Sequence, residues 1–245
     1  MSRSCKFLRP FWRYYGAKWR AARRYPEPMH GTIVEPFAGA AGYALRYPDR
    51  NIVLVEKYAC IAGIWRWLIG ASRADVLSVP VVDSTDDLPA SVSQEARWLV
   101  GFCLQDTAKR PCTNLSAGMR RLRDAGEDRG WSAKMRDRVA NQVEAIRHWR
   151  VIEGDYTAAP DMEATWFVDS PYERTGVHYK HGSRDLDFSA LGAWCRTRRG
   201  QVMVCEEGDA AWLPFRPLYR TVTTGNHRSG TRELLWTNDK GSYVA

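Results

Sequence analysis

The stretch WFVDSPYE could place several reactive groups at the end of one strand. Its apolar run begins at Trp166 and predicts a buried β-strand that stops at Asp169. Ser170 then precedes Pro171, which favours an extended turn, because proline drives the preceding residue out of the helical region. A carboxylate, a stiff backbone carbonyl and the ring of Tyr172 could hold a flat substrate. Taken alone, the same pattern also fits an ordinary turn after a strand.

Three more acidic residues end predicted strands in the same way. Glu35 and Glu56 close the apolar runs TIV and NIVLV, and Asp155 follows WRVIEG. In open α/β sheets, ligands bind at the edge formed by the carboxyl ends of the strands. One acid there is usually a turn residue or a helix cap. Four of them, with Asp169, beside a glycine loop predict a binding site.

The loop PFAGAAG indicates which ligand this edge would take. Gly39 and Gly42 permit close approach of the backbone to a ligand. The loop lacks the Lys-Ser/Thr pair of a P-loop and one glycine of the dinucleotide fingerprint. An acid at Glu56 can bind the two hydroxyls of a ribose, whereas Glu35 suits a cationic amine and would repel a pyrophosphate. S-adenosylmethionine combines a ribose with an amino-acid ammonium group.

Strand and helix patterns alternate along most of the chain. Residues 31–46 predict a strand, the glycine loop and a helix from Tyr43, and residues 60–70 predict a helix capped by Gly70. Strands are also predicted at 51–58, 149–156, 164–172 and 200–207, a helix at 188–198, and a closing hairpin from 219–225 and 231–238. This order predicts an α/β fold with a mainly parallel sheet and a C-terminal antiparallel hairpin.

Residues 71–148 lack this alternation. They begin with a turn-rich segment and continue with loops and heavily basic helical patterns. We therefore predict one domain formed by residues 1–70 and 149–245, with a small helical module inserted at 71–148.

Charge and cysteine content narrow the class of protein. A net charge of +8 over 245 residues favours a polyanionic partner such as nucleic acid, with a solvated basic surface as the alternative. The six cysteines form no C-x-x-C pair, which argues against a zinc site and predicts free thiols in the cytoplasm. No apolar run approaches the roughly 20 residues that a membrane span needs, and the basic N-terminus has no secretory cleavage pattern.

In series, these motifs resemble the Dam-like DNA adenine methyltransferases, in the compact form found in phages and prophages. FWRYYGAK is similar to the family's N-terminal PYxGGK, and EPFAGAAG to its DPFxGxG. VEKY carries the ribose-binding acid, EGDY the acid for the cofactor's adenine, and DSPY resembles the catalytic DPPY. The resemblance covers most of the chain outside residues 71–148.

The resemblance implies a Rossmann-like fold, S-adenosylmethionine as cofactor, and double-stranded DNA as substrate in a bacterial or phage-infected cell. By position, the cofactor pocket would contain Tyr15, Lys18, Glu35, Phe37, Gly39, Glu56, Asp155 and Tyr156. Asp169, Ser170, Pro171 and Tyr172 would form the catalytic motif. Phe37 as plain core and Tyr156 as a surface aromatic remain the alternatives for these two rings.

In this family a flipped-out adenine would present its amine to the Asp169 carboxylate and the backbone carbonyl of residue 170, and would stack on Tyr172. Serine at position 170 departs from the family's proline, and Glu35 replaces an aspartate. The short insert predicts loose sequence specificity. Basic residues of the insert would contact DNA phosphates, or else form a solvated helix face: Arg120, Arg121, Arg123, Lys134, Arg136 and Arg138.

Two other functions remain open from the sequence. A cytosine N4-methyltransferase would use a similar motif, although there serine more often opens it, whereas Asp169 opens it here. A catalytically silent DNA-binding protein would keep the fold, and Ser170 is the main support for that alternative.

Overall fold

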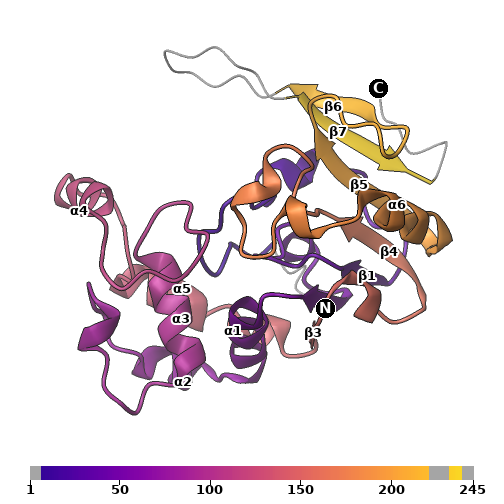
Figure 1. Cartoon of the computed structure of the whole chain (residues 1–245). Helices are drawn as coiled ribbons and strands as arrows, with labels where there is room; N and C mark the ends of the chain where they lie inside the picture. Colours follow the sequence, from indigo (N-terminus) through magenta and orange to yellow (C-terminus); the bar gives the residue numbers. More distant parts are fainter. Residues whose placement is uncertain (1–6, 221–231, 239–245) are drawn as a thin grey trace.

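The computed structural model describes residues 7–220 and 232–238, whose centre is a seven-stranded sheet in the order β3-β2-β1-β4-β5-β7-β6 (Figure 1). The strands are β1 (Thr32–Glu35), β2 (Asn51–Glu56), β3 (Arg150–Glu153), β4 (Glu163–Val168), β5 (Arg199–Glu207), β6 (Arg216–Arg220) and β7 (Arg232–Thr237). Strands β1 to β5 pair in parallel, and β7 runs antiparallel to both β5 and β6. The predicted α/β class, with its mainly parallel sheet and antiparallel hairpin, is confirmed.

The direction in which the chain crosses the sheet changes at β1. After β1 the chain adds β2 and β3 on one side, and it then returns to add β4 and β5 on the other. In such sheets the crossover connections diverge at this point and leave a crevice outside the carboxyl ends of the two central strands. Glu35 ends β1 and Asp169 follows β4 directly, so both residues lie at this crevice.

Apolar layers cover both faces of the sheet. On β1 and β2, Ile33 and Leu54 belong to the core that includes helix α1 (Ala59–Gly70), whereas Val34 and Val53 belong to the core that includes α6 (Phe188–Thr197). Successive residues alternate because side chains on a strand point to opposite faces. This two-sided burial explains why the strands read as continuous apolar runs.

The segment between α1 and β3 consists of helices joined by loops. It contains α2 (Arg73–Ser78), α3 (Gln94–Cys103), α4 (Ala117–Asp124) and α5 (Ala133–Ala140). Each helix begins after a serine whose hydroxyl accepts a backbone N–H three residues on: Ser72, Ser93, Ser116 and Ser132. Short 3-10 turns complete the described chain: η1 (Ala21–Arg24), η2 (Ala44–Arg46), η3 (Thr85–Asp87), η4 (Val143–Ile146), η5 (Tyr156–Ala158), η6 (Gly176–His178) and η7 (Ser183–Asp185).

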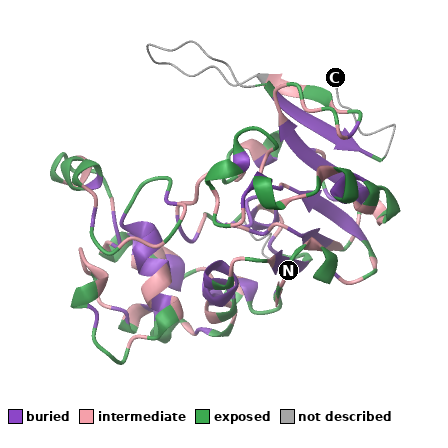
Figure 2. Cartoon of the chain, viewed as in Figure 1, coloured by how far each residue is buried: buried purple, intermediate pink, exposed green. Residues whose placement is uncertain are grey.

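The insert shares its apolar core with the rest of the protein. Val76, Leu99 and Val139 of the insert belong to the same buried cluster as Trp65 of α1. The division into residues 1–70 with 149–245 and residues 71–148 therefore stays a sequence-based prediction. Helix α4 differs from its neighbours, because it protrudes from the molecule and Met119 is its buried residue (Figures 1 and 2).

Several predicted boundaries were wrong. The helix expected from Tyr43 is only the 3-10 turn η2, which ends before Pro48, since proline disfavours helix in the residue before it. Gly70 is the last residue of α1, and Ala71 is its C-cap. The basic helical stretch is interrupted at Gly126 and Gly130, where φ is +88° and +76°. Strand β6 begins earlier than predicted, and residues 221–231 of the hairpin lie outside the described residues.

Candidate active site

The carboxyl edge of the sheet holds a cavity of about 300 Å³. The structure brings the strand-end acids Glu35, Glu56, Asp155 and Asp169 together around it. All the residues that the resemblance assigns to the cofactor also line it: Tyr15, Lys18, Glu35, Phe37, Gly39, Glu56, Asp155 and Tyr156. Parallel strands end at one edge, so the register of four strands fixes the spacing of these groups.

The glycine loop after β1 closes one side of the cavity. Gly39 adopts φ +45° and its N–H donates to Glu56 Oε2 over 2.9 Å, while the N–H of Tyr58 donates to Glu56 Oε1 over 2.8 Å. A Cβ at Gly42 would lie 2.9 Å from the backbone nitrogen of Lys18. The loop therefore packs directly on the N-terminal segment that carries Lys18.

Glu35 is an almost completely buried carboxyl group, with 2% of its surface exposed. Its Oε1 accepts the N–H of Ala44 over 2.6 Å. Burial raises the pKa of Glu35 to about 8, against the opposite effect of the Ala44 hydrogen bond. A buried carboxylate is costly unless it is paired, so a cationic ligand beside Glu35 would restore its charge.

An aromatic pair forms the side of the cavity near β3. The rings of Phe37 and Tyr156 stack with centroids 5.7 Å apart and an angle of 26° between their planes. Next to them, Asp155 Oδ1 accepts the backbone N–H of Thr157 over 2.9 Å. Hydrogen bonds from Thr157 hold the pKa of Asp155 below its ordinary value. The cavity thus offers a flat apolar surface with an ionised acceptor beside it.

Asp169 forms an ion pair that the sequence did not predict. Its Oδ1 lies 2.9 Å from Lys18 Nζ, and the two side chains are only 19% and 12% exposed. Burial raises the pKa of Asp169, and Lys18 works against that rise. Burial alone would lower the pKa of Lys18, but the charges of Asp169 and Glu233 outweigh it and raise that pKa. Each charge therefore favours the ionised form of the other.

The remaining residues of DSPY do not all reach the cavity. Pro171 lines it together with Asp169, whereas Ser170 and Tyr172 lie outside its lining. The hydroxyl of Tyr172 donates to Glu233 Oε1 over 2.5 Å, and Lys18 Nζ lies 4.5 Å from the centroid of its ring. The Tyr172 ring, expected as an open stacking face, is packed beneath the Lys18 ammonium group instead.

Glu233 of β7 links the hairpin to this motif. Its Oε1 also accepts the hydroxyl of Tyr25 over 2.5 Å, so two phenols share one buried carboxyl oxygen. Ser170 is buried nearby, with 3% of its surface exposed, and its hydroxyl has no hydrogen-bond partner among the described residues. Glu233 stands far from the motif in sequence, and nothing in its local pattern predicted the contact.

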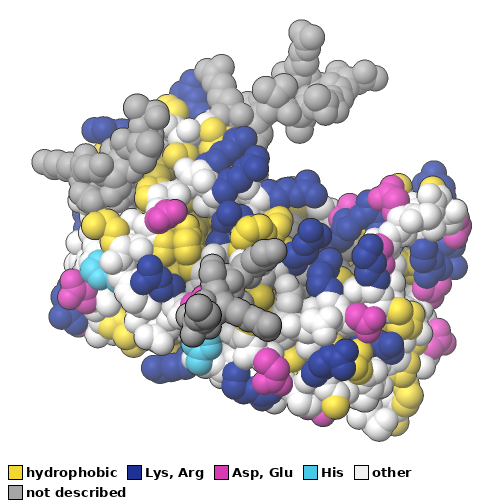
Figure 3. All heavy atoms as spheres, turned by 180° about the vertical axis from the view of Figure 1, so that it is seen from behind, with side chains coloured by type: hydrophobic (Ala, Val, Ile, Leu, Met, Phe, Trp, Pro, Cys, Tyr) yellow, Lys and Arg dark blue, Asp and Glu magenta, His cyan; other side chains and the backbone are white. Residues whose placement is uncertain are grey.

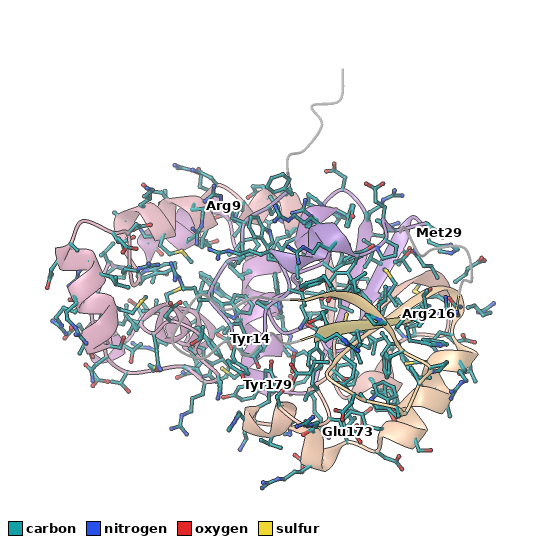
Figure 4. The ribbon with its side chains drawn as sticks, turned by 90° about the horizontal axis from the view of Figure 1, so that it is seen from above. Arg9, Tyr14, Met29, Glu173, Tyr179 and Arg216 are labelled. Atoms are coloured by element: carbon teal, nitrogen blue, oxygen red, sulfur yellow. The ribbon has the colours of Figure 1, made fainter. Side chains whose placement is uncertain are left out.

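A segment that sequence reasoning missed returns over the cavity. Tyr179, His181, Asp185 and Asp187 line it from the connection between the DSPY motif and α6. The hydroxyl of Tyr179 donates to the backbone oxygen of Tyr15 over 3.2 Å. Tyr14 and Tyr179 lie close together in the middle of the molecule, with ring centroids 6.0 Å apart (Figure 4). The segment has short turns and no periodic pattern that could have placed it.

The basic residues of the insert lie on α4 and α5, but most of those predicted to bind DNA are engaged within the protein. Arg123 Nη1 and Nη2 contact Asp83 over 2.5 and 2.7 Å. Arg120 lies 4.0 Å from the same carboxylate. Arg136 and Arg138 donate to backbone oxygens of Val79 and Pro10, over 3.5 and 3.3 Å. Within the described part of the chain, Arg121 and Lys134 are exposed and have no polar partner.

Among the described residues, no group of His, Cys, Asp or Glu side chains is arranged to hold a metal ion. Within the same residues, no helix has both the length and the apolar character to cross a membrane. Cys60, Cys103, Cys112, Cys195 and Cys205 are free thiols.

Comparisons with known proteins add little to this geometry. No protein-family model matches the chain, and no curated protein matches it. A solved structure described as a conserved hypothetical protein of Streptococcus pyogenes is 12% identical, with a TM-score of 0.33. The match covers 87% of this chain and 88% of that one. A likeness this distant carries no argument about function.

Proposed function

We propose that the protein is an S-adenosylmethionine-dependent DNA methyltransferase that acts on the N6 amine of adenine. One observation carries the proposal: a single cavity is lined by every residue that the resemblance assigns to the cofactor and by Asp169 and Pro171 of the DSPY motif. The net charge of +8 suits a DNA substrate.

The groups around the cavity fit this cofactor. Its volume of about 300 Å³ is within the range of small-molecule sites. The buried Glu35 would gain an ionic partner from the ammonium group. The Glu56 oxygens each accept one backbone N–H and keep lone pairs for ribose hydroxyls. Phe37, Tyr156 and Asp155 would take the adenine, by stacking and by accepting from its amine. The bound cofactor would supply an electrophilic methyl group.

The target base must leave the duplex to reach this cavity, since its amine is otherwise paired within the stack. Asp169 and the backbone carbonyl of Ser170 would accept the two amine hydrogens and orient the nitrogen lone pair. Lys18 favours the ionised form of Asp169 against the effect of burial. An ionised acceptor also stabilises the positive charge that develops on the nitrogen during transfer.

Tyr172 takes a different part in this proposal from the one its motif suggested. With its hydroxyl on Glu233 and its ring beneath Lys18, it supports the Lys18–Asp169 pair rather than offering a free stacking face. Serine at position 170 keeps the carbonyl on which the motif depends, because that acceptor belongs to the backbone.

Incubation with methyl-labelled cofactor and unmethylated duplex DNA, followed by digestion to nucleosides, tests the proposal. We expect label in N6-methyladenine, and none when Asp169→Asn replaces the wild type. Label in N4-methylcytosine would establish the cytosine enzyme instead. Unlabelled DNA, combined with cofactor binding by calorimetry, would contradict transfer to DNA while leaving the cofactor site intact.

One observation favours a second candidate, a catalytically silent DNA-binding protein. The Lys18–Asp169 pair occupies one oxygen of the acid on which transfer depends. A carboxylate has about four lone-pair sites, so a target amine can still bond to it. The same labelling experiment separates the two candidates.

A further inference from the structure

A second cavity, of about 820 Å³, adjoins the first and is called the basic groove below. Its walls come from the connection between α3 and α4, at residues 105–112, and from residues 178–180 after the DSPY motif. Tyr15, Tyr58, Tyr179 and Lys180 line both cavities. The two spaces are therefore neighbours across a shared wall of aromatic side chains.

The sign of the charge changes from one cavity to the other. Six acidic side chains and three lysines line the first cavity, whereas no described residue that lines the basic groove is Asp or Glu. Lys109, Arg110 and Lys180 line the groove, and among the described residues none of these three forms an ion pair. Unpaired cations along a groove attract a polyanion and are available to bind it.

Half-buried rings accompany these cations. Tyr179 is held in place by its hydrogen bond to Tyr15 and by an edge contact between the two rings at 5.5 Å. Lys109 Nζ lies 4.4 Å from the centroid of the Tyr15 ring and covers one of its faces. Tyr58, on the loop after β2, lines both cavities. Cations interleaved with rings are typical of surfaces that bind single strands of nucleic acid.

Charge alone does not identify this surface. Lys and Arg side chains are also spread over the face seen from behind, mixed with acidic and apolar ones (Figure 3). Arg120 and Arg123 of α4 contact Asp83, and so are not free in the same way. Among the described residues Arg121 and Lys134 are unpaired as well, so the basic groove differs because its unpaired cations share one lining with aromatic side chains and border the cavity where the target base would react.

We infer that the basic groove holds the stretch of DNA strand next to the extruded adenine. Phosphates of that strand contact Lys109, Arg110 and Lys180, and a neighbouring base stacks against Tyr58. This inference rests on the proposed function, since it takes the first cavity as the place where the base is methylated.

The test measures binding of fluorescent oligonucleotides to the full chain by anisotropy between 50 and 300 mM salt. Each phosphate contact contributes about 0.9 to the slope of log K against log salt for duplex DNA, and about 0.7 for a single strand. The double variant K109Q/R110Q removes two contacts, so it should reduce the magnitude of this negative slope by about 1.8 with duplex DNA and by about 1.4 with a single strand. The matched control, R50Q/R150Q, removes the same charge from exposed residues at the amino ends of β2 and β3, away from the carboxyl edge, and should leave the slope unchanged.

An unchanged slope in K109Q/R110Q, or a slope lowered only in the control, would overturn the inference. Cofactor binding by calorimetry serves as the folding control, because neither Lys109 nor Arg110 lines the first cavity. The result is separable from the proposed function. If the slopes change as expected but no methyl group is transferred, the groove binds DNA and the proposed enzymatic function is contradicted. If methyl transfer occurs but the slopes do not change, the enzymatic function is supported and the groove is contradicted.

A second pair of variants tests the stacking surface. Tyr58→Ala should weaken binding of the single-stranded oligonucleotide about tenfold, as loss of one stacked base does elsewhere. Tyr58→Phe keeps the ring and should bind as the wild type does. Wild-type affinity in both variants would show that no base stacks on Tyr58, and a loss in both would attribute the effect to the hydroxyl and contradict stacking.

Discussion

Charged side chains at the carboxyl edge of the sheet and those on helices α4 and α5 differ in their exposure to solvent. At the sheet edge, Glu35 is buried, Lys18 and Asp169 are largely shielded from solvent, and each of the three has a pKa moved from its ordinary value. On α4 and α5, Arg121 and Lys134 are exposed. Burial of charge is expensive, so its presence at one edge needs a reason, whereas exposed charge on a helix needs none.

The comparison teaches which kind of sequence signal can be trusted. Strand-end acids were predicted to meet because parallel strands must end at one edge, and they do line one cavity. The cations of the insert were grouped only by nearness in sequence. In the structure Arg123 contacts Asp83 within the insert, and Arg138 donates to Pro10 of the N-terminal segment.

The largest expected effect is at Asp169. Asp169→Asn keeps the size of the side chain but removes the charged acceptor, so methyl transfer in single-turnover assays should fall by about 10²–10³-fold or more. Cofactor affinity should stay close to that of the wild type. The matched control is Asp161→Asn, an exposed acid near Arg199 and away from the cavity. A variant that retains wild-type turnover would show that burial at this edge is unrelated to catalysis.

The Lys18–Asp169 pair predicts a pH dependence. In the proposed mechanism the ionised form of Asp169 accepts the target amine, and burial raises the pKa of Asp169, so the rate should fall as the pH drops through that pKa. Removal of an opposite charge raises a carboxyl pKa by about 1–3 units. Lys18→Met should therefore move the acid limb of kcat/KM to higher pH by that amount, with recovery of activity at alkaline pH.

Lys57 provides the control for this shift. It lines the same cavity but is exposed and has no ion pair with Asp169. Lys57→Met should leave the position of the acid limb unchanged. Equal displacement in both variants would attribute the effect to the general charge of the cavity, and no displacement in Lys18→Met would separate the ion pair from catalysis.

Glu35 predicts opposite effects on stability and on binding. Burial raises its pKa from 4.5 to about 8, so within this window the folded state binds more protons than the unfolded state. The free energy of unfolding should fall as the pH rises through the window, and Glu35→Gln, which cannot titrate, should lack that fall. The same variant should lose about 1.5–3 kcal/mol of cofactor affinity, as expected for a hydrogen bond to a charged group.

Urea unfolding from pH 5 to pH 8 without cofactor measures the first effect, and calorimetry measures the second. Glu163→Gln, an exposed acid at the start of β4, is the control. If the free energies of unfolding of Glu35→Gln and the wild type change in parallel with pH, burial does not raise the pKa of Glu35 as its position implies.

Long-range contacts explain what the sequence could not predict. The order of strands and the residues that end them follow from local patterns and from the geometry of a parallel sheet. The Glu233–Tyr172 contact joins β7 to the segment after β4, although β5 lies between these two strands in the sheet, and the approach of Tyr179 to Tyr15 depends on an irregular segment. Such contacts leave no periodic pattern in the sequence. The strand-end residues that line the cavity were therefore predictable, whereas the segment with Tyr179 that returns over it was not.

The smallest expected effect tests the other region. Arg123 and Asp83 are 36% and 39% exposed, so their ion pair should stabilise the fold by about 0.2–1 kcal/mol, the range for solvent-exposed pairs. Arg123→Gln and Asp83→Asn should each lower the free energy of urea unfolding by that amount. The double variant should cost little more than either, because both changes remove the same interaction.

Arg121→Gln, on the same helix and without a partner among the described residues, should have almost no effect. If Arg123→Gln instead left stability unchanged and reduced the salt dependence of DNA binding, α4 would be a DNA-contacting surface, and the contrast between the two regions would fail.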